Sequence, residues 1–426
     1  MLIKNKLLQG QVNIPPSKSV SHRAIICAAL AKGKSIISNL ILSEDTLATI
    51  NCLRLLGADI SYVPEQDDRY QVIVQGGLQE AIEPQQALDC GESGSTLRFL
   101  IPIAAAFGAK CTFIGHGRLG QRPLDSYYEI FDAQGLAYTT VNRCLPLAVG
   151  SKLQAGNFVM RGDISSQFIT GLLFALPLLE SDSKITITTE LESVGYIDLT
   201  LQVLSEFGIV IDNHDYKEFV IKGGQEYQAR DYSVEGDYSQ AAFWLVAACL
   251  GNNIICSGLN PNSLQADKAV LNIIQDMGGE VVWFGENKVT CKPVLTKGCR
   301  IDVANCPDIA PILTVLASLS SGQTQIVNAA RLRIKESDRI TSTATELNKL
   351  GAKVSEQHDS LEVEGVSALQ GGAQLDAWND HRIAMALAIA CTRSNAPSTL
   401  SGHTSVKKSY PGFWNDYRAL GGVCEE

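Results

Sequence analysis

The chain has 426 residues, 45% of them hydrophobic and 19% charged, which fits two or three globular domains and excludes a disordered protein. A formal net charge of −10 disfavours broad binding to nucleic acid or to an anionic membrane surface, while remaining compatible with a locally cationic site. The twelve cysteines contain no Cys-x-x-Cys pair, so we expect reduced thiols and a cytoplasmic protein.

No targeting or membrane segment stands out in the sequence. The start of the chain has no long apolar stretch, and the longest apolar run, 169–179, is too short to span a bilayer. The six histidines are dispersed without a His-x-x-x-His pair, so no metal site is expected.

In chain order, the sequence predicts a strand at 7–14 followed by six copies of one α/β unit. Each unit begins with a helix that is apolar on most faces, continues with a β-rich run, and then has an amphipathic helix that ends at a glycine. The apolar helices are expected at 19–31, 95–107, 166–179, 239–250, 308–319 and 381–392. The terminating glycines are Gly57, Gly135, Gly208, Gly278, Gly351 and Gly421, roughly 70–80 residues apart.

Three such units fill a domain of about 200 residues, so the expected fold class is α/β with two domains. The N-terminal lobe is expected to span 17–233, and the C-terminal lobe to combine 1–16 with 234–426. The strand at 7–14 is placed in the C-terminal lobe because it has no unit of its own. One continuous solenoid of six units is the alternative, which the unequal burial expected for the two helix types disfavours.

Polar and charged residues gather at the starts of the apolar helices. A helix N-terminus exposes unpaired N–H groups and partial positive charge, which suit a phosphate or a carboxylate. Any single serine or aspartate there is explained equally well as an ordinary N-cap. Lys18, Arg23, Arg98 and Arg382 differ, because they stand at the mouths of apolar helices, where an unpaired charge is rarely buried. We therefore predict a site for multiply anionic small molecules.

Two further charged stretches lead into amphipathic helices. The segment 120–124 is predicted to place Pro123 in a first helical turn, where proline is tolerated. The segment 331–339 is explained either as a solvated helical face or as cations and a carboxylate, including Glu336 and Arg339, presented to a site.

These motifs, in this order along the whole chain, resemble those of the EPSP synthase (3-phosphoshikimate 1-carboxyvinyltransferase) family of enolpyruvyl transferases. They lie at 16–23, 91–98, 122–123, 165–168, 194–198, 234–237, 333–339, 379–382 and 407–411. The resemblance implies two inside-out α/β barrel-like domains, each of three repeated helix–strand units, joined by a two-strand hinge.

The resemblance also implies a transferase that moves the enolpyruvyl group of phosphoenolpyruvate to the 5-hydroxyl of shikimate 3-phosphate and releases phosphate. This reaction belongs to the shikimate pathway of aromatic (chorismate) biosynthesis. No metal, nucleotide or organic cofactor is implied. The expected partners are these two small molecules, without nucleic acid or membrane, and the expected state is a monomer.

Site residues are implied by matching the family's motifs position by position. Shikimate 3-phosphate is expected at Lys18, Ser19, Arg23, Ser165, Ser166, Gln167, Ser193, Asp308 and Lys335. Phosphoenolpyruvate is expected at Lys18, Gly94, Arg122, Gln167, Arg339, Arg382 and Lys408. The catalytic residues implied are Lys18, Asp308, which would take the hydroxyl proton, and Glu336, a companion acid–base group near the methylene carbon.

Some positions depart from the family's pattern. Glu92 stands where members often have Asn, Ser95 replaces the usual Thr, and Arg331, where some members have Asn, is given no role. A carboxylate at position 92 repels a substrate phosphate unless a cation pairs with it. Gly94 is retained, which implies room for glyphosate in the phosphoenolpyruvate site and predicts sensitivity to that inhibitor.

Two other functions are the alternatives. A UDP-N-acetylglucosamine enolpyruvyl transferase carries a reactive cysteine in a mobile loop, whereas Cys111 and Cys144 lie in apolar or strand-like contexts without a cationic loop. A non-catalytic clamp of six α/β units around nucleic acid needs cations spread along its lining helices, but here the cations stand at helix starts.

Overall fold

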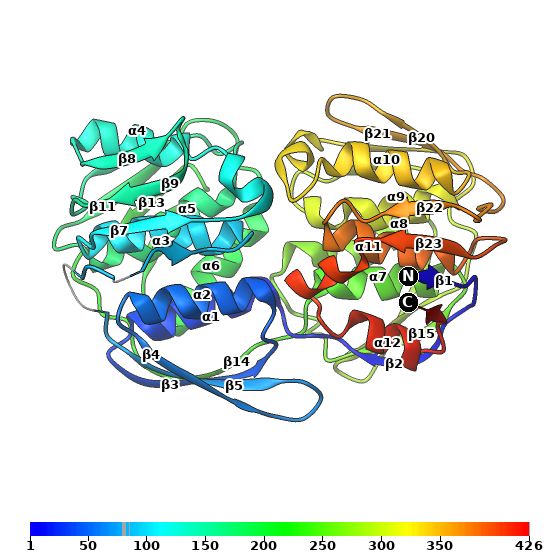
Figure 1. Cartoon of the computed structure of the whole chain (residues 1–426), viewed down its shortest axis with the longest axis horizontal. Coiled ribbons are helices and arrows are strands. Elements are labelled where there is room, and N and C mark those ends of the chain that lie inside the picture. Colours follow the sequence, from blue (N-terminus) through cyan, green and yellow to red (C-terminus); the bar gives the residue numbers. More distant parts are fainter. Residues whose placement is uncertain (79–81, 85, 426) are drawn as a thin grey trace. The chain divides into compact units, whose positions relative to one another are not determined.

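The computed structural model describes residues 1–78, 82–84 and 86–425, and the chain folds as two compact units. Unit 1 comprises Met1–Ser17 and Glu235–Glu426, and unit 2 comprises Lys18–Val234. Unit 2 is therefore an insertion, in sequence, within unit 1. Both ends of the chain belong to unit 1, where they lie together (Figure 1) because β1 (Leu2–Ile3) pairs with β24 (Cys424–Glu425).

Each unit repeats one arrangement three times: an inner helix, a strand, an outer helix and a β-hairpin (Figure 1). In the last copy of unit 1, β24 and β1, from the two ends of the chain, take the place of the hairpin. The inner helices are α1 (Lys18–Leu30), α3 (Gly94–Ala106) and α5 (Ser166–Ala175) in unit 2, and α7 (Tyr238–Cys249), α9 (Ala310–Ser318) and α11 (His381–Cys391) in unit 1. The outer helices are α2 (Glu44–Leu55), α4 (Asp125–Gln134), α6 (Val194–Glu206), α8 (Ala269–Asp276), α10 (Arg339–Lys349) and α12 (Phe413–Ala419). Short 3-10 turns are η1 (Gly117–Gln121), η2 (Leu176–Leu178), η3 (Ala266–Lys268), η4 (Pro307–Ile309), η5 (Ala330–Ile334) and η6 (His403–Lys408).

In the part of the chain that the structure describes, the strands form six four-stranded sheets, three in each unit. In unit 2 they are β14 (Asp231–Ser233), β3 (Gly33–Leu40), β5 (Tyr70–Gly76) and β4 (Asp59–Pro64); β6 (Leu88–Asp89), β7 (Cys111–Ile114), β9 (Cys144–Val149) and β8 (Tyr138–Val141); and β10 (Asn157–Met160), β11 (Ser183–Ile187), β13 (Glu218–Ile221) and β12 (Ile211–His214). In unit 1 they are β2 (Gln9–Asn13), β15 (Asn253–Ser257), β17 (Lys288–Lys292) and β16 (Glu280–Phe284); β18 (Arg300–Asp302), β19 (Gln323–Val327), β21 (Leu361–Glu364) and β20 (Lys353–Glu356); and β22 (Gln374–Asp376), β23 (Ser398–Ser401), β1 and β24.

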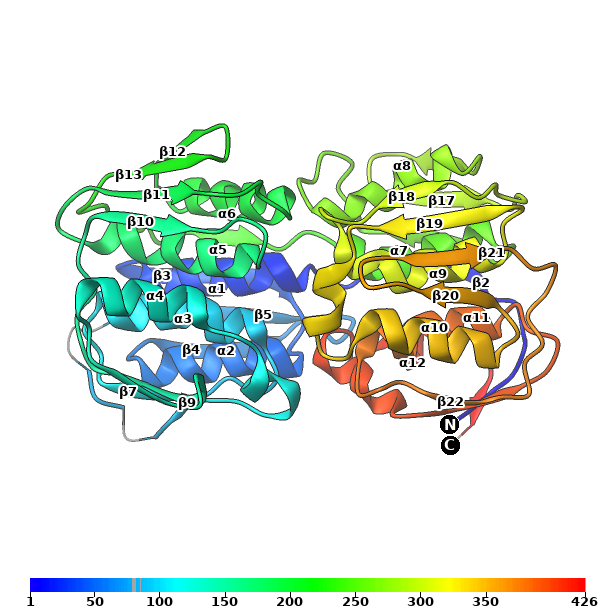
Figure 2. The same cartoon turned by 90° about the horizontal axis from the view of Figure 1, so that it is seen from above.

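All six sheets have the same pairing: one parallel pair followed by two antiparallel pairs, for example β6∥β7 and then β9 and β8. The inner helices lie inside the sheets and are apolar on all sides, so that α7 and α11 are buried along their whole length. In Figure 2, α1, α3 and α5 lie inside unit 2 with its strands around them. Each unit thus has its own hydrophobic core with helices at the centre, which is the inside-out α/β arrangement expected from the sequence.

The chain passes between the units at two neighbouring points. The strand β2, which precedes α1 in sequence, pairs in parallel with β15 of unit 1, and β14, which precedes α7, pairs in parallel with β3 of unit 2. At the first crossing the Ser17 amide donates to the Glu235 carbonyl at 2.7 Å, and Pro16 bridges to Gly236.

The helix boundaries show where sequence expectations hold and where they are wrong. The inner helices start within two residues of their predicted starts, and all six predicted glycines have positive φ, as a left-handed helix end requires. The third inner helix ends early, at Ala175, because Pro177 allows only a 3-10 turn. The placement of Pro123 in a first helical turn is wrong, since α4 begins at Asp125 with Leu124 as its N-cap.

Two features are absent from the described residues. No helix there is both long and apolar enough to cross a bilayer. Nor do those residues include a group of three or more His, Cys, Asp or Glu side chains placed to hold a metal ion.

Candidate active site

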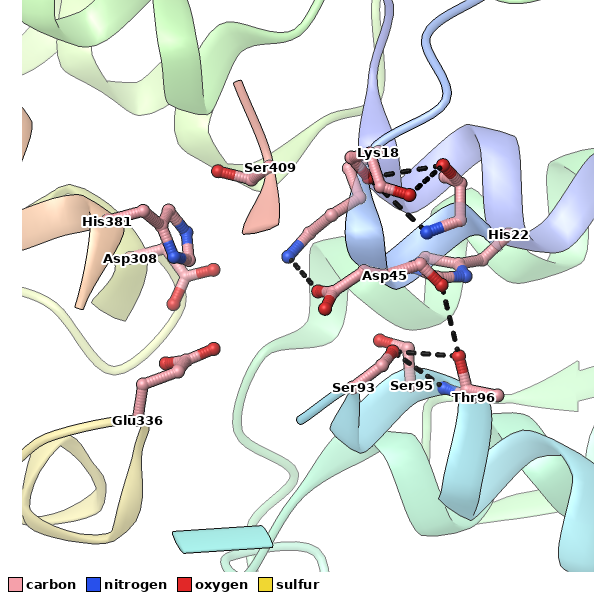
Figure 3. A network of polar contacts seen from close by, with 12 residues as sticks. Lys18, His22, Asp45, Ser93, Ser95, Thr96, Asp308, Glu336, His381 and Ser409 are labelled. Carbon is pink, nitrogen blue, oxygen red and sulfur yellow. Dashed lines mark hydrogen bonds and ion pairs between the residues drawn. The ribbon is translucent and has the colours of Figure 1, made fainter. Parts of the chain in front are cut away.

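In unit 2, the first residue of α1 is a lysine whose ammonium group forms an ion pair with a carboxylate. Lys18 Nζ lies 2.7 Å from Asp45 Oδ2 (Figure 3), and both side chains are largely enclosed, with exposed fractions of 17% and 10%. Asp45 stands in the first turn of α2, whose N-cap Ser43 accepts from the Thr46 amide. A carboxylate at this helix start is favoured by the helix dipole, so α2 holds the group that orients Lys18.

Behind Lys18, buried hydroxyls connect the starts of three helices. His22 Nδ1 lies 2.8 Å from Thr49 Oγ1, which lies 2.6 Å from Thr96 Oγ1. The Thr96 hydroxyl donates to the N-cap Ser93 at 2.8 Å, a contact that Figure 3 shows. Burial, followed by the neighbouring Lys18 charge, lowers the pKa of His22 well below its usual value. The histidine is therefore a neutral hydrogen-bonding group that locks α1, α2 and α3 together.

Arg23, one turn further along α1, is buried among neutral acceptors. Its Nε donates to Thr200 Oγ1 at 2.9 Å, and its two terminal nitrogens donate to the Ser19 carbonyl at 2.8 Å and the Tyr196 carbonyl at 3.1 Å. Burial lowers its pKa to about 10, partly offset by Tyr196. The guanidinium stays charged at neutral pH, and these bonds fix it between α1 and α6.

The loop before α3 forms a narrow space lined by cations. A Cβ on Gly94 would lie 3.0 Å from Arg122 Nη1, 3.2 Å from Arg98 Nη1 and 3.2 Å from Gln167 Oε1. Arg98 donates to Gln167 Oε1 at 2.6 Å, and Gln167 Nε2 donates to Ser95 at 3.0 Å. Two arginines and an amide thus surround a residue without a side chain, which suits close approach of a small anion.

The remaining unit 2 candidates stand at the starts of the inner and outer helices. Ser165 is the N-cap of α5 and accepts from the Gln167 amide, and Ser166 is the first residue of that helix. Ser193 is the N-cap residue of α6 and has φ +58°, a left-handed conformation that is rare for serine. Its side chain makes no cap hydrogen bond to α6. Such strain in a helix start is typical of a functional position.

In unit 1, one carboxylate is shared by three cations. Asp308, in the 3-10 turn before α9, lies 2.9 Å from Arg339 Nη1, 3.3 Å from Lys335 Nζ and 3.4 Å from Arg382 Nη2. Its side chain is 21% exposed, so it remains accessible to a ligand. A carboxylate in this position can accept a hydrogen bond from a bound hydroxyl.

Arg339, the first residue of α10, is the most enclosed of these cations. Besides Asp308, it binds Glu336 at 2.7 Å and Asp380 at 2.8 Å, and its side chain is 2% exposed. Burial by itself lowers the pKa of Arg339, but Asp380, Glu336 and Asp308 together raise it above the ordinary value. Glu336 lies in the loop between η5 and α10, so of the two explanations for 331–339 the solvated helical face is wrong.

The other cations of unit 1 lie around the start of α11. Arg382 donates to the Ser239 carbonyl at 3.2 Å, and Lys408 Nζ donates to the Asn379 carbonyl at 2.6 Å. Burial tends to lower the pKa of Arg382, but Asp308 raises it, so this guanidinium is charged. Burial lowers the pKa of Lys335, opposed by Asp308.

The predicted residues thus fall into two clusters, one in each unit. The unit 2 cluster consists of Lys18, Ser19, Arg23, Gly94, Arg122, Ser165, Ser166, Gln167 and Ser193, together with Arg98 and Asp45, which were assigned no role from the sequence. The unit 1 cluster consists of Asp308, Lys335, Glu336, Arg339, Arg382 and Lys408, with Asp380 and Asp267 added by the structure.

Different signals could have indicated the missed residues. Arg98 was noted at a helix mouth, and its contact with Gln167 is the reason to include it. Asp45 and Asp380 are single carboxylates at helix starts, a pattern indistinguishable in sequence from ordinary caps. Asp267 lies in the short turn η3, and nothing in its neighbourhood predicts its burial beneath Ser239.

The fold and the clusters together define an α/β enzyme of the enolpyruvyl transferase class. The EPSP synthase of Acinetobacter baumannii superposes with a TM-score of 0.79, at 26% identity, covering 99% of this chain and 97% of that one. The enolpyruvyl transferase NikO of Streptomyces tendae has the same TM-score and, at 18% identity, shares the fold.

Sequence comparison is more specific. The model of the family described as EPSP synthase (3-phosphoshikimate 1-carboxyvinyltransferase) matches residues 3–417. A 3-phosphoshikimate 1-carboxyvinyltransferase of Clostridium kluyveri is 50% identical over 98% of this chain and 96% of the relative, and one of Clostridioides difficile is 51% identical over 98% and 97%. The chain belongs to the EPSP synthase family. The relatives' names support the expected activity and not the alternative with UDP-N-acetylglucosamine.

Proposed function

We propose that this chain transfers the enolpyruvyl group of phosphoenolpyruvate to the 5-hydroxyl of shikimate 3-phosphate, forming 5-enolpyruvylshikimate 3-phosphate and inorganic phosphate. The observation that carries the proposal is identity of about 50%, over nearly the whole chain, to proteins named for this reaction. The clusters support it because both substrates are anions and both clusters contain fixed cations.

We assign the phosphate of shikimate 3-phosphate to the hydroxyl-rich part of the unit 2 cluster. Ser165, Ser166 and Ser193 lie at helix starts, where backbone N–H groups and hydroxyls bind phosphate oxygens. Arg23 supports this region by fixing α1 against α6, and Lys18 and Ser19 lie at the start of the same helix. Lys335 and Asp308 of unit 1 complete the set for this substrate.

We assign phosphoenolpyruvate to the cations around Gly94 and around the start of α11. Arg122 and Gln167 lie within 3.2 Å of the position that a Cβ on Gly94 would occupy, and Arg339, Arg382 and Lys408 belong to unit 1. Planar guanidinium forks match both carboxylate and phosphate.

The chemistry then needs one base and one acid. Asp308 accepts the proton of the 5-hydroxyl while the hydroxyl oxygen bonds to C2 of phosphoenolpyruvate, and C3 accepts a proton from an acid, for which Glu336 and Lys18 are the candidates. In the second step C3 loses a proton, the C2–O bond to phosphate breaks, and inorganic phosphate leaves. Proton transfer by a positioned group contributes about 10²–10⁴-fold, and alignment of the substrates supplies more.

We also propose that the enzyme works as a monomer in the cytoplasm. All twelve cysteines are free thiols, most of them buried, as expected for a reducing compartment. Sedimentation at micromolar concentration tests the monomer, and a stable dimer would contradict it.

Phosphate release by the purified full-length chain tests the proposed reaction. We expect release only when both shikimate 3-phosphate and phosphoenolpyruvate are present, with formation of the enolpyruvyl ether confirmed by mass spectrometry. Release supported by UDP-N-acetylglucosamine and phosphoenolpyruvate, without shikimate 3-phosphate, would contradict the proposal.

A further inference from the structure

Asp380 is a buried carboxylate that makes four hydrogen bonds at the start of α11. Its Oδ2 accepts from Arg339 Nε at 2.8 Å and from the Ser337 hydroxyl at 3.0 Å. Its Oδ1 accepts from Arg339 Nη2 at 3.2 Å and from the Arg382 backbone amide at 2.9 Å. Its exposed fraction is 0%, so it contacts protein groups on all sides.

This carboxylate differs from the other two that contact Arg339. Asp308 and Glu336 have side chains that are 21% and 14% exposed, so each can exchange Arg339 for a ligand or for water. Asp380 is enclosed and binds the guanidinium through two nitrogens, which fixes the plane as well as the position of the fork. Asp380 is therefore the permanent anchor of Arg339.

The turn before α11 also supports the other two cations of unit 1 assigned to phosphoenolpyruvate. The Arg382 amide is capped by Asp380, and Lys408 Nζ donates to the carbonyl of Asn379, the preceding residue. Arg339, Arg382 and Lys408 thus all contact the dipeptide Asn379-Asp380. A single two-residue segment fixes three cations that lie on three different elements.

The turn before α11 has a backbone conformation that its residue types rarely adopt. Trp378 and Asn379 both have left-handed backbone conformations, with φ +53° and +52°, which are rare in consecutive residues other than glycine. The buried carboxylate of Glu346 on α10 holds the turn by accepting from the Trp378 indole at 2.8 Å and from the Asp376 amide at 3.0 Å. Such strain persists only where surrounding contacts over-determine the geometry.

We propose that Asp380 is a positioning residue for phosphoenolpyruvate: it fixes Arg339 directly and Arg382 through the cap of α11, without touching substrate. The inference rests on the proposed function, because that function assigns both arginines to phosphoenolpyruvate. It predicts that Asp380 sets the affinity for this substrate and has little influence on the affinity for shikimate 3-phosphate.

The test is Asp380→Asn in the full-length chain. Asparagine has the same shape and is a good N-cap, but its single acceptor oxygen cannot receive both Arg339 nitrogens and the Arg382 amide. We expect the KM for phosphoenolpyruvate to rise about 10–100-fold, the range for loss of a charged hydrogen bond, and the KM for shikimate 3-phosphate to change less than about threefold.

Asp237→Asn removes a second buried capping carboxylate of unit 1, one whose charge also acts on Arg382, and serves as the comparison. Asp237 is the buried N-cap of α7, another inner helix of unit 1, and accepts from the Gln240 amide at 3.1 Å. A general effect of changing a buried capping aspartate would alter the unfolding midpoint and the two KM values similarly in both variants. A rise in both KM values by the same factor in Asp380→Asn would overturn the proposal.

A double-mutant cycle with Arg339→Lys separates positioning from damage to the fold. Lysine keeps the charge but has no planar fork, so the two-nitrogen contact with Asp380 that orients the side chain is already lost. Adding Asp380→Asn to Arg339→Lys should change the KM for phosphoenolpyruvate less than about twofold beyond the lysine variant. Independent, multiplying effects would show that Asp380 does not act through Arg339.

Wild type, Asp380→Asn, Arg339→Lys and the double variant together distinguish this inference from the proposed function. If wild type released no phosphate with both substrates, the proposed function would fail, and urea unfolding would still measure the coupling of Asp380 to Arg339. A non-additive pair of midpoint shifts supports the anchor, and additive shifts overturn it.

Discussion

The two clusters contain similar cations but neutralise them differently. In unit 2, Arg23 and Arg98 donate to hydroxyl, carbonyl and amide oxygens, which are neutral. Lys18 forms an ion pair with Asp45. In unit 1, Arg339 alone is bound to three carboxylates. The unit 2 cluster is thus arranged to attract anions, whereas the unit 1 cluster holds carboxylates and cations in balance, as proton transfer requires.

This difference predicts a division of labour within the chain. Removing a cation from the unit 2 cluster should weaken binding of one anionic substrate. Removing a unit 1 carboxylate that takes part in proton transfer, such as Asp308, should reduce turnover while binding is largely kept. Asp380, which anchors Arg339, should instead affect binding.

The largest effect is expected for Asp308→Asn. The amide keeps the shape of the side chain but cannot accept a proton, so kcat should fall about 10²–10⁴-fold, while each KM changes less than about tenfold. Steady-state phosphate release at varied concentrations of both substrates measures this. Asp276→Asn, at an exposed position on α8, removes the same charge and should leave both parameters unchanged. A normal kcat in Asp308→Asn would contradict its role as the base.

Arg122→Ala should have the next largest effect, on binding. Loss of a charged hydrogen bond costs about 1.5–3 kcal/mol, which corresponds to a rise of about 10–150-fold in the KM for phosphoenolpyruvate. The affinity for shikimate 3-phosphate should change less than about threefold. Arg143→Ala, an exposed arginine that pairs with Asp125, is the control for net charge. Equal losses for both substrates would show that Arg122 is not specific for phosphoenolpyruvate.

Asp267 tests the charge balance of unit 1 through pH. Burial, followed by the charge of Asp308, raises the pKa of Asp267 from 3.8 to about 6. The folded state therefore binds the proton of the Asp267 carboxyl more tightly than the unfolded state does. Protonation of Asp267 adds to the free energy of unfolding below about pH 4, and this contribution is lost as the pH rises through 6. A shift of this size corresponds to about 1–3 kcal/mol.

The variant Asp267→Asn cannot ionise and keeps an acceptor for the Ser239 hydroxyl. We expect it to be more stable than wild type at pH 7.5 and to lose most of that advantage at pH 5. Urea unfolding midpoints measured from pH 5 to 8 give the comparison. A constant difference across this range would mean that Asp267 does not titrate as described.

The smallest effect is expected for Gly94→Ala. The added methyl group would lie 3.0–3.2 Å from Arg122, Arg98 and Gln167, all of which are ends of flexible side chains that can move slightly. Because the space is shared with phosphoenolpyruvate in the proposed site, its KM should rise about tenfold, in line with the typical cost of overpacking. Inhibition by glyphosate, expected for the wild type, should weaken at least as much. Unchanged KM and inhibition would place both ligands away from Gly94.

Much of the fold could be predicted from the sequence because its signals are local. Apolar helices such as α7 and glycine ends such as Gly135 are determined by patterns within one repeat. The sequence shows that the strand at 7–14 has no unit of its own, but it does not predict the pairing of β2 with β15, about 240 residues away. The prediction that Pro123 lies in a first helical turn was wrong. Where α4 begins depends on where the preceding 3-10 turn ends, which the local sequence does not show.

The site was less predictable, for a physical reason. Cations at the mouths of apolar helices are conspicuous, so Lys18, Arg23 and Arg382 could be singled out from their positions. Their partners are single carboxylates that become significant only through burial and contacts made by distant parts of the chain. Asp380 looks like an ordinary cap, and its role depends on Arg339, 41 residues earlier.

Product formation in D2O tests most directly whether carboxylates of unit 1 serve proton transfer to carbon. If C3 of phosphoenolpyruvate is protonated and then deprotonated, the enolpyruvyl methylene of the product will contain solvent deuterium, detectable by mass spectrometry. We predict deuterium in the wild-type product. Product formed over many turnovers without deuterium at that carbon would contradict the account. In that case C3 would not have received a proton from an exchangeable group such as Glu336 or Lys18.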